Sequence, residues 1–301
     1  MKAVLLHGYG GVDQLFYEDV PEPKPKAGEV LVKVEATSLN PIDWKIRSGA
    51  RKEMFPQTFP AILGRDVAGT VVALGPDTRG FRTGDRVMGL VNHAYAEFLV
   101  AKAEDLAHIP DGLATEDAAA LPLVVTTGSQ LIEKAVQPRA GETVLVTGAV
   151  GSVGRTAVYV ARKHGMTVIA GVRERQRKEA ATLGADRIVA IDDDRSIASL
   201  GEVDAIADTV DGDTIRKLLP HLRHGGVLGS VLGKPEGSED KGFEVRAFSA
   251  QPDAKRLEQL AEAVAQGEFS IPIAKRMKLS QVREAQTIAE KGDIGKILLL
   301  P

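Results

Sequence analysis

The stretch TVLVTGAVGSVG, from Thr143 to Gly154, decides the fold of this chain. Its first five residues are apolar or β-branched, which is the composition of a short buried strand. Glycines at every third position then lead into a helix. Gly148 permits a tight turn off the strand, Gly151 lets the backbone approach a phosphate, and Gly154 lets the helix pack closely on the strand. The pattern predicts a site for the pyrophosphate of a dinucleotide.

The first turn of the predicted helix completes this site. Backbone N–H groups of the first turn, where Ser152 and Val153 lie, face the bound anion, and the helix dipole favours negative charge there. The Ser152 side chain either caps the helix or contacts the phosphate. A tight turn with a purely structural role is the alternative. The strand before the glycines and the helix after them favour a dinucleotide.

The composition excludes several kinds of chemistry. The chain has 301 residues, 44% of them apolar and 26% charged, which indicates a globular protein of about two domains. The net charge of −3, without a long basic block, argues against nucleic acid as a partner. The chain has no cysteine, which excludes disulfides, zinc–thiolate sites, iron–sulfur clusters and a cysteine nucleophile.

The sequence gives no sign of a membrane segment. No apolar run approaches the length of a membrane span, and the first residues, MKAVLLH, become polar too early for a signal peptide. We therefore expect a cytoplasmic protein with no membrane partner.

The chain changes character near residue 115. Before it, short strands are expected over residues such as 30–36, 67–74, 85–90 and 95–100, punctuated by turn glycines, which suggests a compact β-barrel. After it, strands and helices alternate, which predicts a parallel sheet with right-handed crossovers. The strands are expected at 144–147, 167–170, 187–191, 203–210 and 227–232, and the helices at 153–164, 175–183 and 213–222. A turn at Gly225-Gly226 is expected before the last of these strands.

The last fifty residues contain too few elements for a core of their own. A helix over 253–266, a strand over 273–279, a helix over 280–290 and a strand over 297–300 are expected there. We expect them to pack on the first domain. The predicted domains are therefore 1–115 together with 253–301, and 116–252 inserted between them.

Several short motifs occur in an order and spacing that resemble those of a known family. They are NPIDWK (40–45), LGRDVAGTV (63–71), GDRVMG (84–89), LPLVVTT (121–127), LGAD (183–186) and GKILL (295–299). Together with the glycine motif, they resemble the medium-chain dehydrogenase/reductase superfamily, in its quinone oxidoreductase (zeta-crystallin-like) branch. The resemblance implies an α/β protein with a GroES-like β-barrel catalytic domain and a Rossmann cofactor domain built on a doubly wound parallel sheet. It also implies an active site in the cleft between these two domains.

The chain departs from the zinc-dependent members of this superfamily. Those members carry a cysteine ligand in the region of residues 40–43 and a Gly-His-Glu motif, which here reads Gly64-Arg65-Asp66. Arginine stays protonated and cannot ligate zinc. We therefore expect no zinc. His93 is a lone loop histidine, for which a solvated surface role is the simpler interpretation, and His221 and His224 are expected to cap a helix end.

The residues after the second predicted strand of the cofactor domain indicate which dinucleotide binds. NAD-type sites place an acid there to bind the ribose 2′-hydroxyl, but no carboxylate stands at Gly171. Arg173 follows two residues later and could bind a 2′-phosphate. This predicts NADPH. Glu174 keeps NADH open as an alternative, and a solvated basic helix face accounts for part of the run RERQRK (173–178).

The resemblance implies hydride transfer from NADPH to a quinone or an α,β-unsaturated carbonyl. Without zinc, the negative charge that develops on the carbonyl oxygen needs a cation or hydrogen-bond donors. Lys45 is the first candidate, with a plain surface lysine as the alternative. Tyr95 is a candidate proton donor, with packing in the core as the alternative.

Further residues are candidates for contact with the cofactor. Asn40 either lies near the nicotinamide ribose or precedes Pro41 as a turn residue. Thr126 or Thr127 could face the nicotinamide from the interdomain helix. The backbone from Val231 to Gly233 ends a strand where the carboxamide could bind. Lys296 either reaches a cofactor phosphate or is a strand-edge lysine.

The expected partner is a small quinone or enone. The resemblance also implies a homodimer or homotetramer, formed through an edge strand at 243–248. A different class of function remains open, namely an NADPH-binding sensor or structural protein with little turnover.

Overall fold

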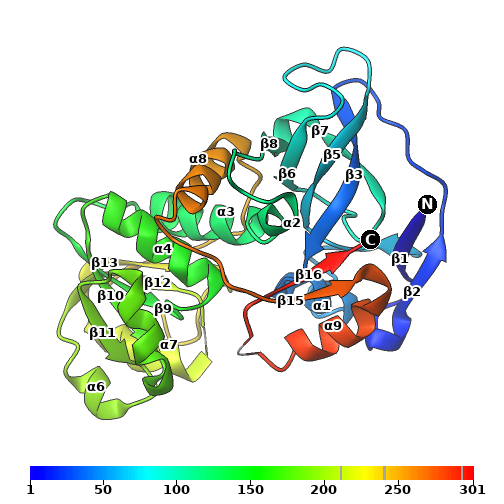
Figure 1. Cartoon of the computed structure of the whole chain (residues 1–301). Helices are drawn as coiled ribbons and strands as arrows, with labels where there is room; N and C mark the ends of the chain where they lie inside the picture. The colour runs from blue at the N-terminus through cyan, green and yellow to red at the C-terminus, as the bar shows by residue number, and fades with distance from the viewer. Residues whose placement is uncertain (211, 240–241, 293) are drawn as a thin grey trace. The chain divides into compact units, whose positions relative to one another are not determined.

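The computed structural model describes residues 1–210, 212–239, 242–292 and 294–301 (Figure 1). The chain forms two compact units. The first unit comprises Met1–Leu123 and Pro252–Pro301, and the second comprises Val124–Gln251. The sequence places the first boundary at 115/116, whereas the structure divides the chain within helix α3 (Pro122–Gln130).

The second unit is built on a parallel sheet with strand order β11-β10-β9-β12-β13-β14 among the described residues. The first strand of the unit, β9, lies inside the sheet, and the order reverses between β9 and β12. This is the doubly wound arrangement, in which ligands bind at the carboxyl ends of the strands beside the reversal. The strands are β9 (Thr143–Thr147), β10 (Thr167–Val172), β11 (Arg187–Ala190), β12 (Val203–Asp208), β13 (Leu222–Ser230) and β14 (Glu244–Ala247).

Short helices connect these strands, with α4 (Ser152–Lys163) after β9, α5 (Arg177–Ala180) after β10, α6 (Asp194–Ala198) after β11 and α7 (Gly212–Leu218) after β12. The crossovers cover the sheet, so the central strands are buried on both faces and consist of runs of Val, Leu, Ile and Ala. The predicted alternation of strands and helices is confirmed, and with it the α/β class.

The expectation for residues 213–232 is wrong in detail. Helix α7 ends at Leu218, and a 3-10 turn containing Pro220 replaces the rest of the predicted helix. Proline has no N–H to continue a helix. Strand β13 then starts at Leu222 and runs through Gly225 and Gly226 with a shift in its register to β12. His224 therefore lies in a strand, and the ring of His221 contacts the carbonyl oxygen of Gly201 at 2.9 Å.

The first unit consists mainly of antiparallel strands. One sheet has the order β15-β16-β3-β5-β6-β8 with β7 on β3, and a smaller sheet has the order β2-β1-β4. The strands are β1 (Lys2–Leu6), β2 (Leu15–Asp19), β3 (Glu29–Ser38), β4 (Ala61–Ile62), β5 (Asp66–Leu74), β6 (Arg86–Leu90), β7 (Phe98–Lys102), β8 (Leu106–His108), β15 (Ile273–Lys278) and β16 (Lys296–Leu300). The C-terminal strand β16 pairs with β3, Leu298 opposite Ser38.

The helices of the first unit are α1 (Pro41–Arg47), α2 (Thr115–Ala118), α8 (Ala254–Ala265) and α9 (Val282–Ala289). Helix α1 was not predicted, although Asn40 followed by Pro41 is a usual helix start, with proline at the first helical position. Among the described residues, no helix is both long and apolar enough to cross a membrane.

Candidate functional site

The glycine turn after β9 has the geometry that the sequence predicts. Gly148 has a φ of +61°, in the left-handed region that favours glycine. A Cβ on Gly154 would lie 2.2 Å from the carbonyl oxygen of Gly148, so helix α4 can pack this closely only with glycine there. Arg155 stabilises the same turn, because its Nε donates to the carbonyl oxygen of Val150 at 2.9 Å.

The start of α4 offers a cradle for an anion. Gly151 is the N-cap, and a Cβ placed on it would have one described neighbour, the Gly148 oxygen at 3.2 Å. The N–H of Arg155 bonds to the carbonyl oxygen of Gly151 at 2.8 Å and begins the helical ladder. Before that bond come the N–H groups of Ser152, Val153 and Gly154, which, as in the first turn of any helix, have no acceptor within the helix. The residues present therefore fit a pyrophosphate.

A buried aspartate, which the sequence analysis missed, holds the neighbouring strand ends together. Asp208 ends β12 and is fully buried. Its Oδ1 accepts from the Thr147 hydroxyl at 2.9 Å and from the N–H of Val210 at 3.1 Å. Its Oδ2 accepts from the Ser230 hydroxyl at 3.2 Å. One carboxylate thus links the ends of β9, β12 and β13 at the edge where the order of strands reverses.

The segment after β13 begins with bonded backbone and then has free space at Gly233. The N–H of Val231 bonds to the carbonyl oxygen of Asp208 at 3.3 Å. Gly233 has a φ of +119°, and its missing side chain would meet no described atom within 4 Å. The backbone is therefore open to a flat amide at Gly233, and the N–H of Leu232 is bonded to the Ser230 hydroxyl at 3.2 Å.

Arg173 is the first residue after β10, because that strand continues to Val172 rather than ending where the sequence suggests. Its side chain is exposed. The guanidinium of Arg177 donates to Glu174 at 2.6 Å and to the carbonyl oxygen of Ile188 at 3.2 Å. The carboxylate of Glu174, the alternative ribose ligand, is therefore paired with Arg177.

Helix α3 carries the two threonines that the sequence singles out. Thr126 is 2% exposed, and its hydroxyl oxygen has no hydrogen-bond partner among the described residues. Buried hydroxyls normally have a partner, so this one is suited to a ligand. Thr127 is also buried and does make a polar interaction.

The first unit contains a buried polar cluster around Asp66. Asn40 donates from Nδ2 to Asp66 Oδ2 at 2.8 Å, and Lys296 Nζ donates to Asn40 Oδ1 at 2.8 Å and lies 3.4 Å from Asp66 Oδ2. Asp66 also accepts from the Ser38 hydroxyl and from the N–H of Leu123. Burial lowers the pKa of Lys296, although the Asp66 carboxylate opposes this.

Two predictions for this cluster need correction. Lys296 is 5% exposed and its ammonium faces three acceptors of the first unit, so it is neither positioned for a phosphate nor an edge lysine, since β16 lies between β15 and β3. Asn40 is buried as the residue before α1, with both ends of its amide bound within the cluster. This matches its alternative role before Pro41.

Tyr95 is fully buried in a hydrophobic cluster of the first unit, which matches its alternative role in the core. Its hydroxyl donates to Asp43 Oδ2 at 2.8 Å. Burial and the Asp43 carboxylate raise the Tyr95 pKa well above its ordinary value. The Tyr95 hydroxyl is therefore an unsuitable acid for direct contact with a substrate.

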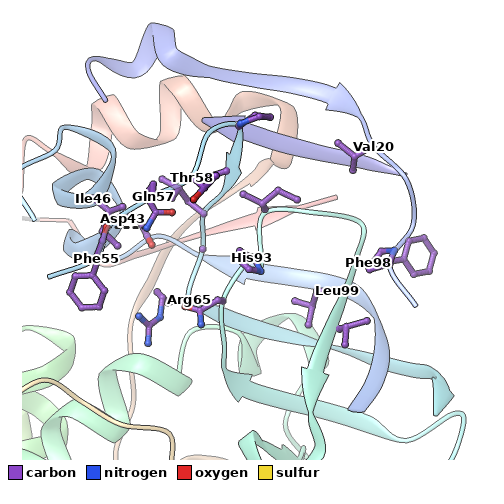
Figure 2. Close-up of a pocket in the computed structure, with 18 of the residues that line it drawn as sticks. Val20, Asp43, Ile46, Phe55, Gln57, Thr58, Arg65, His93, Phe98 and Leu99 are labelled. Atoms are coloured by element: carbon purple, nitrogen blue, oxygen red, sulfur yellow. Dashed lines mark hydrogen bonds between the residues drawn. The ribbon is translucent and has the colours of Figure 1, made fainter. Parts of the chain in front are cut away.

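A pocket of about 760 Å³ opens in the first unit (Figure 2). Its wall is mixed in character, with apolar side chains such as Phe55 and Leu99 and the polar side chains Asp43, Gln57, Arg65 and His93. The Arg65 guanidinium lies 6.0 Å from the centre of the Phe55 ring, and its buried Nε has no hydrogen-bond partner among the described residues.

The other candidates lie near this pocket with different exposure. Lys45 is half-buried on α1 and is not one of the described residues that line the pocket, although its helix neighbours Asp43 and Ile46 are. His93 is an exposed loop histidine that also lines the pocket. Within the described part of the chain, no group of three His, Cys, Asp or Glu side chains is arranged to hold a metal.

Comparison with known proteins identifies the relatives of this chain. Residues 26–111 match the alcohol dehydrogenase GroES-like domain, and residues 183–299 match the zinc-binding dehydrogenase family. The chain is 30% identical to the chloroplast envelope quinone oxidoreductase homolog of Arabidopsis thaliana and also to the quinone oxidoreductase of Homo sapiens. Each alignment covers 100% of this chain and 98% of the relative.

A solved structure gives the same result. The quinone oxidoreductase from Coxiella burnetii superposes with a TM-score of 0.91 at 29% identity, covering 100% of this chain and 99% of that one. The predicted combination of a GroES-like and a Rossmann domain is thereby confirmed. The chain belongs to the quinone oxidoreductase family of the medium-chain dehydrogenase/reductase superfamily.

Proposed function

We propose that this protein is an NADPH-dependent reductase that transfers hydride to a quinone or an α,β-unsaturated carbonyl without zinc. The observation that carries the proposal is the glycine turn at the start of α4, beside the reversal of strand order. The bound nicotinamide would supply the hydride, so the protein has to bind, orient and stabilise charge.

The choice of NADPH rests on the residues after β10. Arg173 is an exposed residue immediately after the strand. The carboxylate of Glu174, which would have to bind the ribose of NADH, is paired with Arg177. A guanidinium can bind a 2′-phosphate with two parallel hydrogen bonds, and an acid there would repel it. Thr126, whose hydroxyl has no partner in the described part of the chain, is the side chain of α3 best suited to contact the nicotinamide.

A catalytic zinc does not fit the residues present. Arg65 stands where the zinc-dependent relatives have histidine, and a guanidinium cannot ligate zinc. The neighbouring Asp66 is already bound by Asn40 and Lys296 in the interior of the first unit. The pocket with Arg65 on its wall is the proposed substrate site, where this cation stabilises the developing oxyanion. Lys45, on the same helix as the lining residues Asp43 and Ile46, is the second proposed cation.

The test is to follow the absorbance of NADPH and NADH with ortho-quinones, naphthoquinones and enones, and to identify the products. Faster oxidation of NADPH than of NADH supports the proposal, and the products separate quinone reduction from alkene reduction. Tight binding of NADPH without oxidation by any acceptor would instead indicate a sensor or structural protein.

A further inference from the structure

A buried carboxyl group on the wall of the pocket has a free oxygen. Asp43 lies on α1, is 1% exposed and lines the pocket (Figure 2). Its Oδ2 accepts the N–H of Asn40 and the hydroxyl of Tyr95, both at 2.8 Å. Its Oδ1 has no hydrogen-bond partner among the described residues. An oxygen in this position is free to carry a proton.

The surroundings of Asp43 favour the protonated form. Burial raises its pKa from 3.8 to about 7, against the opposing effect of the bonds from Asn40 and Tyr95. The charged and titratable groups that act on it are Tyr95 from the segment before β7, Asp66 from β5 and Lys296 from β16, and Arg65 and His93 share its pocket wall. Asp66 raises the pKa further, and Lys296 lowers it.

The proposed reaction requires such a group. Hydride transfer delivers two electrons and one hydrogen to the substrate and leaves an anion, which needs one proton to become the product. Arg65 can stabilise that anion, but arginine does not give up a proton in proteins. Tyr95 is not among the described residues that line the pocket, and its hydroxyl is already donated to Asp43.

We propose that Asp43 is the proton donor of this pocket, an inference that rests on the proposed reductase function. The Oδ1–H bond of Asp43 breaks as the O–H or C–H bond of the product forms, either directly or through one water molecule. Asp43 is left as a carboxylate and regains a proton from solvent. Tyr95 is a positioning residue, because its hydroxyl holds Oδ2 and leaves Oδ1 without a partner among the described residues.

The test compares wild type with Asp43→Asn, which keeps the size of the side chain but cannot supply the proton. Glu53→Gln is the matched control, since Glu53 is an exposed carboxylate that does not line the pocket. Oxidation of NADPH by an enone and a naphthoquinone is measured between about pH 5 and about pH 9. Infrared difference spectra of the cofactor-free proteins follow the carboxyl C=O band over the same range.

We expect wild-type kcat to fall as pH rises through about 7, together with loss of the C=O band. Asp43→Asn lowers kcat by about 100-fold or more and abolishes both the pH dependence and the band, with the KM for NADPH unchanged. Tyr95→Phe moves the fall to higher pH, because the lost bond had favoured the carboxylate. Glu53→Gln behaves as wild type.

An active Asp43→Asn variant with the wild-type pH profile would overturn Asp43 as the donor and leave the reductase function standing. Loss of the pH dependence in His93→Gln, but not in Asp43→Asn, would do the same and assign the proton to His93. Absence of NADPH oxidation by wild type with either acceptor would overturn the reductase function, and the donor role with it.

Discussion

Replacing Asp43 with asparagine should make the first unit more stable at neutral and alkaline pH. In the folded protein the Asp43 pKa is raised from 3.8 to about 7 by burial. The unfolded chain therefore binds fewer protons than the folded protein between about pH 4 and pH 7. The free energy of unfolding consequently falls as pH rises through this window, and asparagine removes this loss.

The structure gives the size of the effect. A rise of about three pKa units, at about 1.4 kcal/mol per unit, corresponds to about 4 kcal/mol. Asparagine replaces the Oδ1 atom, which has no described partner, with an amide nitrogen, and its remaining oxygen still accepts from Asn40 and Tyr95. The difference between Asp43→Asn and wild type should therefore grow by about 4 kcal/mol between acid and mildly alkaline pH.

Urea denaturation at stepped pH measures this difference. Trp44, the single tryptophan of the chain and the neighbour of Asp43 on α1, reports unfolding of the first unit by fluorescence. Glu53→Gln again serves as the control, because it also removes one negative charge but from an exposed position. A difference between Asp43→Asn and wild type that stays constant across the range would refute the raised pKa of Asp43.

Three further predictions concern the second unit. Arg173→Ala should weaken NADPH binding by about 1.5–3 kcal/mol, or about 10–150-fold, and leave NADH binding unaffected. The control Lys178→Ala should change the binding of neither cofactor. An unchanged ratio of the Michaelis constants for NADPH and NADH would exclude the 2′-phosphate contact. Gly151→Ala should have a Tm near that of wild type but a lower affinity for NADPH, measured by calorimetry. Gly154→Ala should lower the Tm, because its Cβ would lie 2.2 Å from the Gly148 oxygen. Equal Tm values for the two variants would contradict this division of roles. Asp208→Asn should lower the free energy of unfolding by about 1.5–3 kcal/mol, because an amide nitrogen cannot accept the hydrogen bonds that the carboxylate accepts from the Thr147 and Ser230 hydroxyls. Urea denaturation followed by far-UV circular dichroism measures this loss, and the control Asp213→Asn, at an exposed position, should lower the free energy of unfolding little.

The features that could be predicted from the sequence are local. The glycines at 148 and 154 act on residues within a few positions of themselves, so the motif carries its own geometry. Arg173 could also be placed from a nearby motif, by counting back from Gly184 to the end of the preceding strand. The order of strands follows from short connections between successive elements.

The buried polar clusters could not be predicted in this way. Lys296 meets Asp66 across 230 residues of sequence, and Tyr95 meets Asp43 across 52. A lysine in a C-terminal strand and a tyrosine in a β pattern give no local sign of these partners. Lys296 was therefore assigned to a phosphate or a strand edge, and Tyr95 to proton donation or core packing. The raised pKa of Asp43 likewise arises from burial by distant segments rather than from its sequence neighbours.

The pairing of Lys296 with Asp66 and Asn40 has a consequence for synthesis on the ribosome. Translation proceeds at roughly 5–20 residues per second, so the 230 residues that separate Asp66 from Lys296 take on the order of 10–50 s. During that interval the nascent first unit has a carboxylate at its centre without its cation, and β3 lacks its partner β16. The second unit, whose residues are all made in between, can fold first, and removal of β16 should leave the first unit with an uncompensated buried charge.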